Sequence, residues 1–89
     1  MNSTEDSFQT YLRSEMDGAG KTFETARARV SALLNASDRA SRHALPAATE
    51  EMAEAMRLYL GSIRRFAHFA ANQQAQREQK AFARHALAG

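Results

Sequence analysis

The 89-residue chain contains no cysteine and no tryptophan, and it has one proline and four glycines. Without cysteine, neither a disulfide nor a thiolate metal site is available to hold a small fold together. The N-terminus lacks the basic and apolar regions of a secretory signal, and no apolar run approaches the roughly 20 residues that span a bilayer. We therefore expect one soluble domain, residues 1–89, with a cytoplasmic location.

Large apolar side chains are also scarce. Of the 39 residues that make up the hydrophobic 44%, 19 are alanine, which favours helix but buries little area. The remaining 20 give a single chain a thin core, so we expect a partner, in the first place a second copy, to complete it. Ten of the twelve basic residues are arginine, and this bias, with the alanine content, suggests a bacterial source.

Apolar residues recur at alternating steps of four and three on both sides of Pro46. This spacing is typical of a helix face that packs on another helix. It predicts an all-α antiparallel helical hairpin, with helices over about 4–42 and 46–87, that pairs into a dimeric four-helix bundle. Proline is tolerated in the first turn of a helix, which favours a turn at 42–46, although the polar stretch 35–43 leaves the end of the first helix open.

The predicted hairpin core has one stripe on each helix. It consists of Leu12, Met16, Phe23, Val30, Leu33, Met52, Met56, Tyr59, Ile63 and Phe66. A turn near residue 44 also places Phe8, Tyr11 and Leu12 near Phe82 at the open end of the hairpin.

Gly18 and Gly20 interrupt the first helix, and each costs about 1 kcal/mol relative to alanine. Because the apolar stripe keeps its phase from Met16 to Phe23, we expect one continuous helix, with a hinge at Gly18 as the alternative. Residues 18–22 resemble the end of a phosphate-binding loop. However, residue 15 is glutamate where that pattern requires glycine, and no strand precedes it.

The second helix carries more apolar residues than one partner helix covers, which indicates contact with more than one helix. The residues predicted to contact a partner or a second copy lie beside the core stripe. They are Ala53, Leu58, Leu60, Ala67 and Phe69.

Few side chains of the chain are placed for catalysis or metal binding. Glu50, Glu51 and Glu54 cluster near His43, but acidic residues are favoured at any helix N-terminus. The chain has no Glu-x-x-His pair of the di-iron type, and none of its three histidines has a serine or carboxylate at a relay spacing. We therefore expect no catalytic residues, no metal site, no cofactor and no enzymatic activity.

Charge is distributed unevenly along the chain. Residues 1–17 carry a net charge of −3 and residues 57–89 a net charge of +5. A hairpin lays these segments side by side, so we expect mutual neutralisation, for example of Glu15 by Arg77 or Lys80. The alternative is a basic stripe that contacts phosphates of nucleic acid. Its members would be Arg57, Arg64, Arg65, Arg77, Lys80 and Arg84.

These features favour a protein–protein interaction module that acts through the apolar flank of the second helix. Such a module would be an adapter, a chaperone-like or inhibitory partner, or an assembly subunit. In size and layout the chain resembles the small helical-hairpin subunits of bacterial secretion systems, although it lacks the Trp-x-Gly turn of one such family. A small basic protein associated with nucleic acid is the other alternative.

Overall fold

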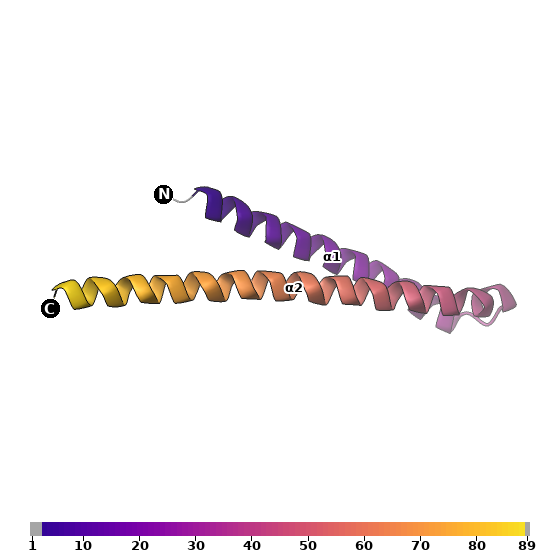
Figure 1. Ribbon diagram of the computed structural model, residues 1–89. Coiled ribbons are helices and arrows are strands. Elements are labelled where there is room, and N and C mark those ends of the chain that lie inside the picture. Colours follow the sequence, from indigo (N-terminus) through magenta and orange to yellow (C-terminus); the bar gives the residue numbers. More distant parts are fainter. Residues whose placement is uncertain (1–2, 89) are drawn as a thin grey trace.

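The computed structural model describes the backbone of residues 3–88 and the side chains of residues 6–84. Two antiparallel helices, α1 (Ser3–Asn35) and α2 (Arg39–Ala88), contain 33 and 50 residues and are joined by residues 36–38 (Figure 1). The predicted all-α helical hairpin is thus confirmed. The molecule measures 74 × 21 × 15 Å, and its radius of gyration of 20.9 Å compares with about 12 Å for a compact domain of this length.

The first helix is continuous through both glycines, as predicted. Gly18 and Gly20 lie in its interior, where the Thr22 hydroxyl donates a hydrogen bond of 3.1 Å to the Gly18 carbonyl. The backbone amides of this stretch therefore serve the helix and are not turned toward a phosphate.

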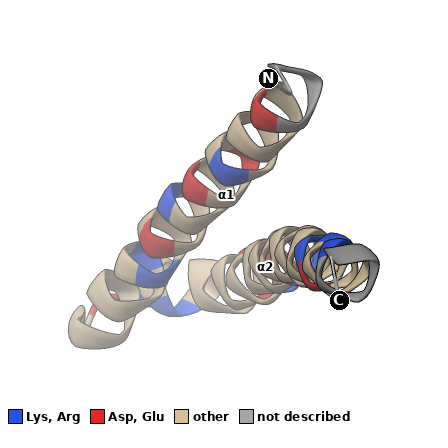
Figure 2. Ribbon diagram, turned by 90° about the vertical axis from the view of Figure 1, so that its left-hand side faces the viewer, with Lys and Arg blue, Asp and Glu red and all other residues tan. Residues whose placement is uncertain are grey.

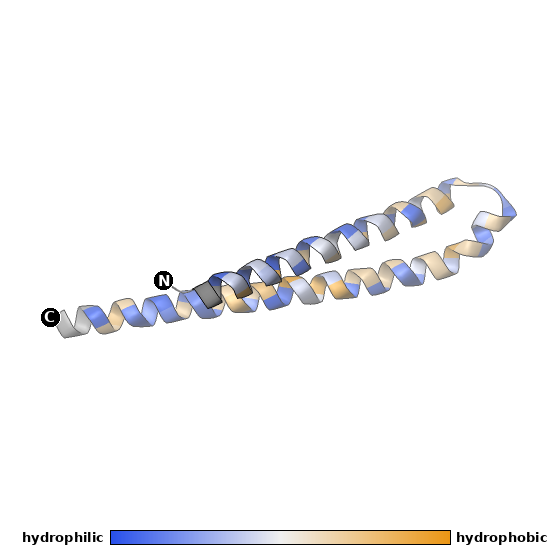
Figure 3. Cartoon of the chain, turned by 90° about the horizontal axis from the view of Figure 1, so that it is seen from above, coloured by the Kyte–Doolittle hydropathy of each residue, from blue (hydrophilic) through white to orange (hydrophobic). Residues whose placement is uncertain are grey.

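The turn lies earlier than predicted. The first helix ends at Asn35 rather than near residue 42, and α2 begins at Arg39, with Pro46 as its eighth residue. The reason is a cap: the Asp38 carboxylate accepts hydrogen bonds from the Ser41 amide (3.0 Å) and the Ser41 hydroxyl (2.7 Å). Pro46 lies inside α2, where it removes one backbone donor, and α2 bends close to the turn (Figure 3), as expected of a helix that contains a proline.

The earlier turn sets the register of the hairpin. Facing residues have numbers that add to about 80, as in Glu15 with Arg65 and Arg29 with Glu51. Phe8 consequently meets Phe69, with ring centroids 5.1 Å apart. The expected cluster of Phe8 with Phe82 is wrong, because Phe82 is 76% exposed.

The second helix packs on α1 through a stripe that we name the inner seam. Its members recur at alternating steps of three and four residues. They are Ala48, Met52, Ala55, Tyr59, Ser62, Phe66 and Phe69.

Small side chains decide which face of α2 is turned toward α1. Ala48, Ala55 and Ser62 are buried, and Ser62 is only 2% exposed, with its hydroxyl donating to the Tyr59 carbonyl in the same helix. The prediction that Met56 is a core residue is wrong, because Met56 is 47% exposed and Ala55 occupies its place. Small residues let two helices approach closely, so the larger neighbours turn aside.

The other predicted core residues are at least half-buried, and Ile63 among them lies at the edge of the helix–helix contact, directly after Ser62 of the inner seam. Leu12 and Val30 are buried, and the rest are half-buried. The half-buried ones are Met16, Phe23, Leu33, Met52, Tyr59, Ile63 and Phe66.

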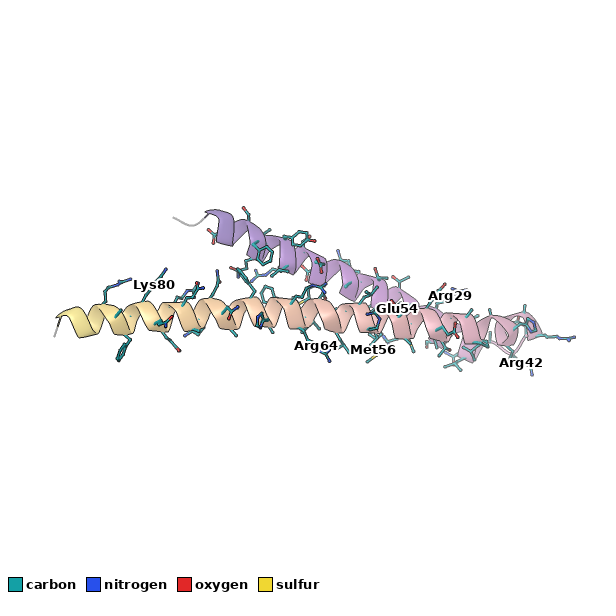
Figure 4. All side chains as sticks on the ribbon, viewed as in Figure 1. Arg29, Arg42, Glu54, Met56, Arg64 and Lys80 are labelled. Carbon is teal, nitrogen blue, oxygen red and sulfur yellow. The ribbon has the colours of Figure 1, made fainter. Side chains whose placement is uncertain are left out.

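The last part of α2 extends beyond α1 (Figure 1). All residues from 74 to 84 are exposed, and we name them the C-terminal extension. Lys80 projects from it, beyond the level at which α1 begins (Figure 4).

Candidate functional site

One side of the hairpin is crossed by ion pairs. Arg29 contacts Glu51 at 2.8 Å, and Glu15 forms the second pair with Arg65. Each of these four residues comes directly before a residue of the helix–helix contact, which places both pairs on the same side. We name it the paired side.

A groove of about 640 Å³ runs between the helices on the paired side. Leu58 lies in its wall opposite Thr22 and Ala26, and the Arg29–Glu51 pair closes one end. The second cross-helix pair, Glu15 with Arg65, is not among the residues that line the groove.

The opposite side of α2 carries a second apolar stripe. Its residues directly follow residues of the inner seam and repeat at steps of three and four, from residue 53 to residue 70. We name it the outer seam. Its members are Ala53, Met56, Leu60, Ile63, Ala67 and Ala70.

The outer seam is open to solvent. Met56 is 47% and Leu60 is 42% exposed, the three alanines are exposed, and Ile63 is half-buried. In Figure 3 the hydrophobic colours lie along the middle of α2, within the range of this seam, and also on both helices close to the turn. Consecutive residues of an α-helix are rotated by about 100° around its axis. The outer seam therefore points nearly at a right angle to the inner seam, which faces α1.

Figure 2 shows that acidic and basic residues alternate along α1. On the side of the outer seam, which we name the open side, α1 carries Arg13, Asp17, Glu24 and Arg27, each of which directly follows a residue of the helix–helix contact. The Arg13 guanidinium lies 5.6 Å from the centre of the Phe66 ring, and Glu24 pairs with Arg27 at 2.8 Å. Between them is Gly20, where the ring of Tyr59 approaches the backbone of α1. The open side is therefore an apolar stripe on α2 bordered by a charged row on α1.

The structure separates the residues predicted to contact a partner. Ala53, Leu60 and Ala67 belong to the outer seam, whereas Leu58 lies in the groove on the paired side. Phe69 packs edge-on against Phe8 within the hairpin and is half-buried, so it does not belong to the outer seam, and its contact with a partner stays a prediction.

Three outer-seam residues were not predicted as partner contacts: Met56, Ile63 and Ala70. The signal for them was present, because together with Ala53, Leu60 and Ala67 they form an unbroken repeat of three and four. Met56 and Ile63 were assigned to the hairpin core instead, because each is larger than the inner-seam residue before it, Ala55 or Ser62.

Several groups with a shifted pKa belong to the exposed ion pairs or contact them. The hydrogen bond from Arg65, and then that from Tyr11, holds the pKa of Glu15 below its usual range, and the same carboxylate raises the pKa of Tyr11. The Arg57 guanidinium lowers the pKa of Glu54. Neutralisation across the hairpin thus exists, but Glu15 pairs with Arg65 and not with Arg77 or Lys80 as expected.

The proposed basic stripe is divided between different surroundings. Arg57 pairs with Glu54 at 2.6 Å, and Arg65 pairs with Glu15 on the paired side. Arg77, Lys80 and Arg84 lie on the C-terminal extension. The six residues do not form one continuous surface.

Within the described part of the chain, no group of three or more histidine, cysteine, aspartate or glutamate side chains is placed to hold a metal ion. The acidic cluster lies inside α2 and not at its N-terminus as expected, because the helix begins at Arg39; within the cluster, Glu51 contacts Arg29 and Glu54 contacts Arg57. Neither helix, over the residues described, is long and apolar enough to cross a membrane.

Comparison of the chain with models of known families, with curated proteins and with solved structures gives no match. The site is therefore characterised by its own geometry.

Proposed function

We propose that this chain is a non-enzymatic protein-interaction module and that the outer seam of α2 is its binding surface. The observation that carries the proposal is an unbroken apolar repeat from Ala53 to Ala70, of which every residue but the half-buried Ile63 is exposed. It extends over about 26 Å, or nearly five turns of the helix.

The chemistry of this surface suits a helical partner. Apolar residues at steps of three and four have the spacing of the residues on one face of a second helix, so the two faces can pack together. Met56 adds an unbranched side chain that adapts to different neighbours, and the alanines allow close approach of the partner backbone. The charged row of α1 beside the seam then provides a polar rim.

The proposal is tested with a photoreactive amino acid at position 60, in the chain produced in its native host. We expect a covalent adduct with a protein upon irradiation, because position 60 lies at the middle of the seam. The matched control carries the same group at position 58, where the side chain is similarly exposed but lies on the paired side.

The proposal would be wrong if position 60 gave no protein adduct, or if position 58 gave the same adduct in equal yield. As a second readout, Leu60→Glu should abolish capture of the cross-linked protein, whereas Leu58→Glu should retain it. Circular dichroism of both variants would verify that the hairpin remains helical.

A further inference from the structure

The outer seam is complementary to itself in the antiparallel direction. We infer that its occupant is a second copy of this chain, bound about a twofold axis at the level of Gly61 and Ser62; this inference rests on the proposed function and names the partner. The axis places Leu60 opposite Ile63 of the second copy and Met56 opposite Ala67 of the second copy. At each end of the seam, Ala53 then faces Ala70 of the second copy.

These pairings match side-chain size along the whole seam. The two branched residues meet at the centre, each methionine meets an alanine, and the alanines meet at the ends. Well-packed helix contacts combine large with small residues in this way, because total volume then stays constant along the interface. A parallel pairing would instead place each methionine against a methionine and each alanine against an alanine.

The angle between the two seams agrees with this arrangement. In a four-helix bundle each helix contacts two neighbours, which lie at about a right angle as seen down its axis. The outer seam lies about 100° around α2 from the inner seam. The second helix therefore has the surface of a bundle helix, with α1 as one neighbour and α2 of the second copy as the other.

The positions of charged residues on α1 are consistent with the same twofold axis, and this argument does not use the outer seam. Because facing residues of the hairpin add to about 80, the axis passes α1 at the level of Gly18 and Ala19. Arg13 then lies opposite Glu24 of the second copy, and the symmetry repeats this pair. Both residues are on the open side, since Arg13 lies over Phe66 and Glu24 lines the hollow beside Gly20. Opposite charges at matching levels specify orientation and register.

A second arrangement, in which the twofold axis runs along the helices and α2 packs antiparallel to α1 of the second copy, fits less well. It would lay the outer seam on α1 of the second copy, against Arg13, Asp17, Glu24 and Arg27. Burial of charged groups against an apolar stripe carries a large desolvation cost. Pairing α2 with α2 avoids this cost.

The surface area of the single hairpin leaves room for such an interface. Its accessible surface is 7111 Å², compared with about 5,200 Å² for a typical monomer of 9.9 kDa. The difference of about 1,900 Å² exceeds the roughly 800 Å² that each partner buries in a standard interface.

Cysteine cross-linking tests the arrangement, because the chain has no cysteine of its own. Ala53→Cys and Ala70→Cys are prepared as separate chains, mixed and mildly oxidised. We expect a mixed 53–70 disulfide and little symmetric product, since two residues at position 53 would be about 26 Å apart across the axis. A mixture of Ala28→Cys with Ala70→Cys is the control, because Ala28 is an exposed alanine outside the outer seam.

A predominant 53–53 disulfide would overturn the antiparallel arrangement, and a mixed disulfide no more abundant than in the control would overturn it as well. Sedimentation of the unmodified chain should show a dimer, with Leu60→Glu weakening association by at least about tenfold. Arg13→Glu and Glu24→Arg should each weaken it, and the double variant should recover most of the loss. If the chain sediments as a monomer while position 60 still cross-links to a protein of another mass, this inference fails and the proposed function remains.

Discussion

At the scale of single residues, the two glycines of α1 have different surroundings, and this difference predicts different effects of the same substitution. A Cβ atom at Gly20 would lie 3.1 Å from Cε1 of Tyr59, whereas a Cβ atom at Gly18 would meet nothing within 4 Å. We expect Gly18→Ala to raise the free energy of unfolding by up to about 1 kcal/mol, because alanine restricts the unfolded chain and favours helix. Gly20→Ala should gain less or lose stability, since the Tyr59 ring must move.

Thermal unfolding of both variants at one protein concentration measures this difference. Phe23 stacks on Tyr59 with ring centroids 6.1 Å apart, so a shift of Tyr59 also disturbs this aromatic pair. Equal stabilisation by the two substitutions would show that Tyr59 has room to move and that Gly20 is not required for the approach of the helices.

At the scale of helices, the cap at Asp38 fixes where α2 begins, and its ionisation predicts how stability depends on pH. Hydrogen bonds from the hydroxyl and then the amide of Ser41 hold the pKa of Asp38 below its usual range. A lowered pKa in the folded state means that the stabilisation is fully present above the ordinary value, about 3.9, and is lost as the pH falls through the folded value. We therefore expect the melting temperature to fall on acidification below about pH 4.

Asp38→Asn isolates this contribution, because asparagine caps a helix as well as aspartate but does not titrate. Its melting temperature should fall less steeply between pH 5 and pH 2 than that of the unmodified chain. Part of the acid transition should remain, because hydrogen bonds also hold the pKa values of Glu15 and Glu54 below their usual range. Asp38→Ala should lower the melting temperature at neutral pH as well. Identical acid profiles for Asp38→Asn and the unmodified chain would contradict a role of this carboxylate in the acid transition.

The helices also show what the sequence can and cannot predict. The steps of three and four residues identify two helices that face each other, because only side chains at that spacing share a helix face. The spacing does not decide between two adjacent residues such as Ala55 and Met56, because both continue a repeat. In the structure the smaller residue, Ala55, packs against α1. Met56 is therefore left on the outer seam. The turn was misplaced because the capping strength of Asp38 and the cost of Pro46 oppose each other, and neither is known from the sequence alone.

At the scale of the whole molecule, the two ends of the hairpin contribute unequally to the fold. Deletion of residues 77–89 removes helix that extends beyond α1, and the described part of it, residues 77–84, is entirely exposed. We expect the melting temperature to change by less than about 3 °C, because little packing is lost. Deletion of residues 1–13 removes the same number of residues but also the buried Leu12 and the contact of Phe8 with Phe69.

Burial of one leucine side chain contributes about 2 kcal/mol, so the N-terminal deletion should lower the melting temperature by at least about 8 °C. Differential scanning calorimetry of both shortened chains, at equal concentration, provides the measurement. If the C-terminal deletion were as damaging as the N-terminal one, the C-terminal extension would have to be packed against something in solution. In the proposed antiparallel dimer, residues 77–84 lie at the level of residues 39–46 of the second copy, which form the start of its α2. That result would therefore place residues 77–84 in the interface and extend it beyond the outer seam.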